Sequence, residues 1–102
     1  MLTKEEIVNT LKASIKDLRE KYGFERIHLF GSYVNGIPTE KSDIDLAVDV
    51  RDRSFKKLKN YINAIEDLKN KFNREIDLVY IDQDCVNPII LKEITERSIT
   101  IE

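Results

Sequence analysis

Aspartates placed inside strand-like segments limit the possible folds of this chain more than any other feature. In the segment 43–48, apolar residues alternate with Asp43, Asp45 and Ala47, which is the period of two expected of a strand with one face in the core. The same alternation in the segment 75–81 places Asp77 opposite the apolar side of a second strand. An unpaired charge inside a strand is costly, so these aspartates indicate a site rather than a core.

Helical patterns surround these strands. Apolar residues recur every three or four positions after Thr3, Ser54 and Asn87, three residues that can cap helices. Gly23 is expected to end the first helix. The segment 26–30 reads as a further strand, followed by a short helical segment through Asn35, and residues 98–102 are expected to be extended. The predicted fold class is therefore α/β, with a small mixed β-sheet (three or four strands) flanked by helices.

Length and charge restrict the function classes. The chain has 102 residues with 17 basic and 19 acidic side chains, and its net charge is −2. A single domain over residues 1–102 is expected. The charge balance provides no basic surface for nucleic acid, and no apolar run is long enough for a membrane span or a signal peptide. A cytoplasmic location is therefore expected.

The three aspartates predict a metal centre. Asp43 and Asp45 should project to one face of their strand, and Asp77 can join them if the two strands are neighbours in the right register. Clustered carboxylates repel one another unless a cation lies between them. Oxygen ligands with no nearby thiolate or histidine suit Mg²⁺ or Mn²⁺.

The dipeptide Gly31-Ser32 predicts a phosphate site. Glycine at the end of a strand lets a ligand approach the backbone closely, and the amides that begin a short helix can hold an anionic oxygen together with the serine hydroxyl. A metal held by few carboxylates usually completes its shell with substrate phosphates. Together the two features predict phosphoryl or nucleotidyl transfer.

Gly31-Ser32, ten further residues and Asp43-x-Asp45 resemble the signature of the minimal nucleotidyltransferases, the MNT domains of the DNA polymerase β-like superfamily. The resemblance covers nearly the whole chain. It implies a nucleotidyltransferase fold and two Mg²⁺ ions held by Asp43, Asp45 and Asp77, with Asp45 bridging them and Asp77 helping to deprotonate the acceptor. Ser32 and the amides around Gly31 would hold the β- and γ-phosphates of ATP.

One position departs from the family pattern. Family members often carry Ala-Arg-Gly where this chain has Val34-Asn35-Gly36, so a cation that could act on the phosphates is missing. Lys41, Lys12 or a basic residue of a partner could replace it, or the enzyme could be slow.

Stand-alone domains of this length resemble the antitoxins of HEPN/MNT toxin–antitoxin pairs. The resemblance implies transfer of AMP from ATP to a tyrosine of a HEPN ribonuclease toxin, which would make this chain a protein adenylyltransferase and an antitoxin. Two alternatives stay open: a binding antitoxin that acts by occlusion, and a nucleotidyltransferase for a small molecule. No residue identifies the base, and the oligomeric state is undetermined.

Overall fold

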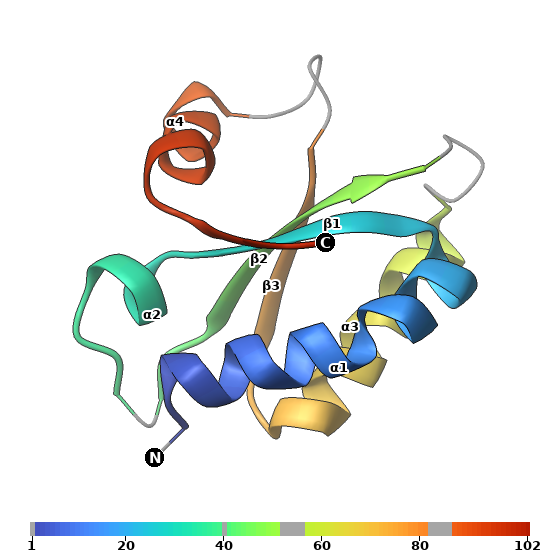
Figure 1. The fold of residues 1–102 in the computed structure, drawn as a ribbon, viewed down its shortest axis with the longest axis horizontal. Coiled ribbons are helices and arrows are strands. Elements are labelled where there is room, and N and C mark those ends of the chain that lie inside the picture. Colours follow the sequence, from blue (N-terminus) through green and yellow to red (C-terminus); the bar gives the residue numbers. More distant parts are fainter. Residues whose placement is uncertain (1, 40, 52–56, 82–86) are drawn as a thin grey trace.

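The computed structural model describes residues 2–39, 41–51, 57–81 and 87–102 (Figure 1). Four helices and four strands are found in these ranges. In chain order they are α1 (Lys4–Tyr22), β1 (Phe24–Phe30), α2 (Ser32–Asn35), β2 (Ile44–Val50), α3 (Leu58–Phe72), β3 (Ile76–Tyr80), α4 (Pro88–Glu96) and β4 (Ile99–Ile101).

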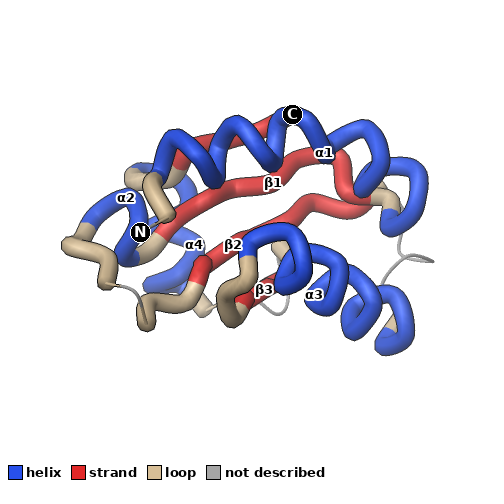
Figure 2. Tube along the Cα trace, turned by 90° about the horizontal axis from the view of Figure 1, so that it is seen from below, coloured by secondary structure: helices blue, strands red, loops and turns tan. Residues whose placement is uncertain are grey.

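The strands form one mixed sheet in the order β3-β2-β1-β4. Strand β1 is antiparallel to both β2 and β4, whereas β2 and β3 are parallel. Helices α1 and α3 cover one face of the sheet, and α4 lies on the other (Figures 1 and 2). The predicted α/β class with a small mixed sheet is thus confirmed. None of the described helices is long and apolar enough to cross a bilayer.

The ends of α1 follow from its sequence. The hydroxyl of Thr3 accepts a hydrogen bond from the amide of Glu6 at 3.2 Å, which satisfies one of the free donors in the first turn. At the other end, Gly23 adopts a left-handed φ of 71° and donates its amide to the carbonyl of Arg19. Both predicted helix boundaries are confirmed.

The two faces of the sheet are packed unequally. The larger core cluster contains the buried residues of α1 and α3 and the residues of β1 and β2 that face them. On the α4 face, a small cluster of Phe30, Ala47 and Ile94 is joined by Val79 and Ile81. A single nine-residue helix covers only part of this face, so polar side chains can occupy the remainder.

The prediction for α3 was wrong in two respects. The helix begins at Leu58, and its N-cap is Lys57, which makes no side-chain capping bond; Ser54 lies outside the described residues. Leu58 is 73% exposed and Ile62 50% exposed, so the apolar stripe does not continue to the start of the helix. The later part of the predicted stripe is confirmed, because Leu68 and Phe72 are buried together with Ala64 and Ile65 packs against the same core.

A polar row on the α4 face links three strands. His28 Nδ1 lies 3.0 Å from Thr100 Oγ1 on β4, and His28 Nε2 lies 3.2 Å from Asp49 Oδ2 on β2. Asp49 also pairs with Arg26 Nε at 3.2 Å. These contacts hold the end of the chain against β1 and thereby hold the residues between α4 and β4 in place.

Candidate functional site

Two of the predicted aspartates are neighbours across the sheet. In the parallel pairing of β2 with β3, Asp45 lies opposite Asp77, and Ala47 lies opposite Val79 two residues later. Adjacent strands are about 4.8 Å apart, and Ala47 and Val79 belong to the cluster under α4. Because strand residues two apart share a face, Asp45 and Asp77 both project to the α4 face. The register condition set by the sequence is met.

The surroundings of Asp45 disfavour its ionised form. Burial, followed by the charge and hydrogen-bonding contact of Asp77 and the charges of Asp43 and Glu93, raises the pKa of Asp45 from 3.8 to about 6. The three neighbours that shift the pKa of this carboxyl are all acidic. A hard divalent cation would relieve the repulsion, and carboxylate oxygens are the ligands such a cation prefers. The side chains present therefore fit Mg²⁺ or Mn²⁺.

This pKa predicts how stability depends on pH when no metal is present. The folded state binds the Asp45 proton more tightly than the unfolded chain does, so the resulting stabilisation is complete below about pH 3.8 and is lost as the pH rises to about 6. The Asp45→Asn variant cannot ionise, so its stability relative to the wild type should increase from about pH 4 to about pH 7. Denaturant titrations in chelator would measure this difference, and a difference independent of pH would contradict the prediction.

Asp43 is placed differently from the other two aspartates. It precedes β2 and is exposed, and it lines a hollow of about 260 Å³ with Lys41, Arg74 and other residues at the end of α3. Its charge still reaches Asp45. Within the described ranges, no three acidic, histidine or cysteine side chains converge closely enough to hold a metal as they stand. The structure thus brings Asp45 and Asp77 together but leaves Asp43 at the margin.

Gly31 packs directly against the Asp45 carboxylate. It follows Phe30, which pairs with Asp45 across β1 and β2, and it adopts φ 78° and ψ −148°, a conformation essentially restricted to glycine. A Cβ atom at this position would lie 2.0 Å from Asp45 Oδ2. The predicted phosphate turn and the predicted metal ligand therefore form one continuous site.

Ser32 begins α2 immediately after this turn. The amides of Val34 and Asn35 both bond to the carbonyl of Gly31, at 3.1 and 2.9 Å. The amides of the first turn that precede them have no acceptor within a helix of this geometry. Ser32 is partly exposed, whereas the following Tyr33 is buried in the main core and anchors the turn. The Ser32 hydroxyl and the first amides lie at the same strand end as Asp45.

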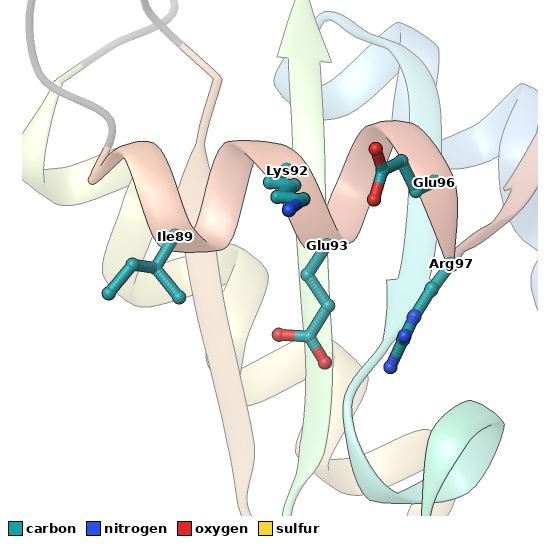
Figure 3. A pocket seen from close by; sticks show the side chains of 5 residues that line it. All are labelled: Ile89, Lys92, Glu93, Glu96 and Arg97. Carbon is teal, nitrogen blue, oxygen red and sulfur yellow. The ribbon is translucent and has the colours of Figure 1, made fainter.

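Helix α4 contributes a wall that the sequence motifs did not indicate. A pocket of about 310 Å³ is lined by residues of α4 and its C-cap, namely Ile89, Lys92, Glu93, Glu96 and Arg97 (Figure 3). Glu93 adds a carboxylate whose charge acts on Asp45. The signal was present in the sequence: Ile90 and Ile94, four residues apart, face the sheet, which places Glu93 and Arg97 together on an adjacent side of the helix.

Asn35 connects this wall to the Gly31-Ser32 turn. Its side-chain Nδ2 donates a hydrogen bond of 3.0 Å to the backbone carbonyl of Arg97. Of the cations suggested by the sequence, Lys41 lines the separate hollow beside Asp43. Lys12 is exposed on α1, on the opposite layer of the molecule (Figure 1). Neither lysine lines the α4 pocket.

Known proteins match this chain over most of its length. The family model for the polymerase β nucleotidyltransferase domain matches residues 13–101. A relative from Methanocaldococcus jannaschii, provisionally named a protein adenylyltransferase, is 35% identical over 96 residues, covering 94% of this chain and 95% of its own length. The protein adenylyltransferase MntA of Thermococcus cleftensis is 42% identical over 73 residues, covering 68% of this chain and 74% of its own length.

A solved structure shares the fold. In a complex described as a tri-AMPylated Shewanella oneidensis HEPN toxin with its MNT antitoxin, the matching chain superposes with a TM-score of 0.63 at 21% identity. The match covers 90% of this chain and 69% of that one. At this identity the likeness shows the fold alone.

Proposed function

This chain belongs to the polymerase β nucleotidyltransferase family, and from that premise we propose that it transfers AMP from ATP to a tyrosine hydroxyl of a HEPN toxin, acting as the antitoxin. The observation that carries the proposal is the β2–β3 register, which sets Asp45 against Asp77, with Gly31 in contact with the Asp45 carboxylate. The relatives named protein adenylyltransferases support AMP transfer to a protein. The fold shared with an MNT antitoxin supports the kind of partner.

Asp43, Asp45 and Asp77 are the residues that would hold two Mg²⁺ ions, or Mn²⁺. When bound, such ions stabilise the attacking and leaving oxygens of an in-line displacement and neutralise phosphate charge. The raised pKa of Asp45 means that cation binding competes with a proton at this carboxylate.

In the proposed reaction, one set of residues holds the phosphates of ATP and Asp77 acts on the tyrosine acceptor. Ser32 and the first amides of α2 would hold the β- and γ-phosphates, which orients the α-phosphorus toward the sheet edge. Asp77 is exposed on the edge strand β3, where a partner can approach, and its carboxylate would accept the tyrosine proton. The tyrosine oxygen then bonds to the α-phosphorus, the bond to the bridging oxygen breaks, and pyrophosphate leaves.

The proposal predicts a labelled partner. The purified chain, incubated with Mg²⁺, ATP labelled at the α-phosphate and the product of the neighbouring gene, should transfer the label to that product. ATP labelled at the γ-phosphate, or addition of a chelator, should give no labelled protein. A partner whose acceptor tyrosine is changed to phenylalanine serves as the matched control. An unlabelled wild-type partner, with nucleotide bound by the chain, would refute AMP transfer.

A second function, neutralisation by occlusion alone, is favoured by two observations. Asp43 is not gathered with Asp45 and Asp77 in the described part of the chain, and Asn35 provides an amide where the family often has a cation. Asp43→Asn combined with Asp45→Asn separates the two functions. Toxicity that the double variant still suppresses would support occlusion, whereas toxicity that returns while the two proteins still associate would support catalysis.

A further inference from the structure

We propose that Lys92 and Arg97, which flank Glu93 on one wall of the α4 pocket, bind the phosphate chain of the nucleotide. The inference deepens the proposed function and rests on it. It assigns the triphosphate to the side of the site formed by α4, and it identifies two cations that the sequence motif does not include.

The charge of the site requires cations beyond the metal ions. The charges of Asp43, Asp77 and Glu93 all act on Asp45, and a nucleoside triphosphate adds several further negative charges. Two divalent ions balance only the four carboxylates. Positive side chains at the phosphate end would offset the remaining repulsion, and each charge-assisted hydrogen bond to phosphate is roughly twice as strong as a neutral one.

The position of Arg97 beside the phosphate turn is defined by contacts of its own backbone. Its carbonyl accepts the hydrogen bond from Asn35, and Asn35 belongs to the same four-residue helix as Ser32. Its amide bonds to the carbonyl of Glu93. In Figure 3 the Arg97 side chain extends from the end of α4 toward α2, while Glu93 extends across β2. The Arg97 side chain thus lies between the end of α4 and α2.

Both cations are available to a ligand. Lys92 and Arg97 are exposed, and across the described ranges neither forms a salt bridge, although Glu93 and Glu96 line the same pocket. By contrast, Lys69 in the hollow beside Asp43 is already paired with Glu75 at 3.0 Å. The planar guanidinium of Arg97 suits bidentate contact with phosphate, and the Lys92 ammonium provides a second point charge.

The test compares two double variants that remove the same charge. Lys92→Ala with Arg97→Ala alters the pocket, whereas Lys16→Ala with Lys59→Ala alters exposed positions of α1 and α3 on the opposite layer. Titrations with a non-hydrolysable ATP analogue and with AMP, each with Mg²⁺, measure dissociation constants. The pocket variant should bind the triphosphate analogue at least about 10-fold more weakly, and AMP less than about 2-fold more weakly. The variant of α1 and α3 should match the wild type.

When Arg97 is changed to lysine instead of alanine, part of the affinity for the triphosphate analogue should be recovered, because the positive charge is kept. The recovery should be incomplete, because lysine cannot make the bidentate contact. Equal weakening by the two double variants would overturn the proposal, since net charge alone would then explain the effect. Unchanged affinity in the pocket variant would also overturn it, as would a wild type that binds no analogue. The proposed function fails separately, when a wild type that binds the analogue labels no partner.

Discussion

The Asp45→Asn variant should transfer AMP about 10³-fold more slowly than the wild type, or not at all, while folding normally. Asp45 is the carboxylate on which the charges of Asp77, Asp43 and Glu93 converge, and it packs against Gly31. Removing such a preorganised charged group costs about 10²–10³-fold or more in turnover. Single-turnover labelling of the partner measures the rate, and denaturant titration at neutral pH should show a stability equal to or above that of the wild type.

Asp49→Asn is the matched control, because Asp49 lies on the same strand and the same face of the sheet. It pairs with Arg26 and His28 at 3.2 Å rather than with the carboxylate site. We expect this variant to be less stable and to retain transfer within about 3-fold of the wild type, since a paired surface charge contributes about 1 kcal/mol or less. If Asp45→Asn kept wild-type turnover, Asp45 would have no part in the chemistry.

Gly31→Ala should impair both stability and transfer. The added Cβ would lie 2.0 Å from Asp45 Oδ2, and φ 78° with ψ −148° is a conformation that alanine adopts only with strain. The strain alone corresponds to about 1–3 kcal/mol of unfolding free energy. Displacement of the Asp45 carboxylate should lower transfer about 10²-fold or more, since errors of about 1 Å in position have effects of that size.

Two comparisons distinguish the clash from a general loss of stability. Gly36→Ala should be milder, because its nearest neighbour would be the Cα atom of Ser32 at 3.3 Å and its φ of −127° is open to any residue. In a double-mutant cycle, Gly31→Ala should cost less unfolding free energy when Asp45 is also changed to alanine, because the clashing carboxylate is gone. Strictly additive effects would show that Gly31 and Asp45 are not coupled.

The residues themselves predicted most of the elements and two of the aspartates that the fold brings together. Alternation around Asp45 and Asp77 predicted two strands, and capping residues such as Thr3 and Gly23 marked the limits of α1, because these signals act over a few neighbouring residues. The start of α3 was predicted wrongly, since a possible capping residue and an apolar repeat do not by themselves specify the turn at which a helix begins. Ile62 fits the apolar pattern and is half exposed.

Contacts between distant segments were decided only by the tertiary structure. The sequence determined that this chain carries an aspartate-rich strand pair and a glycine turn suited to nucleotidyl transfer. The fold decided that Asp45 faces Asp77, that Gly31 has no room for a side chain, and that Arg97 stands beside α2. Strand register and the packing of α4 depend on contacts across the whole sheet. The spacing of Ile90 and Ile94 indicates which side of α4 carries Glu93, but only the fold brings that helix to the Asp45 strand.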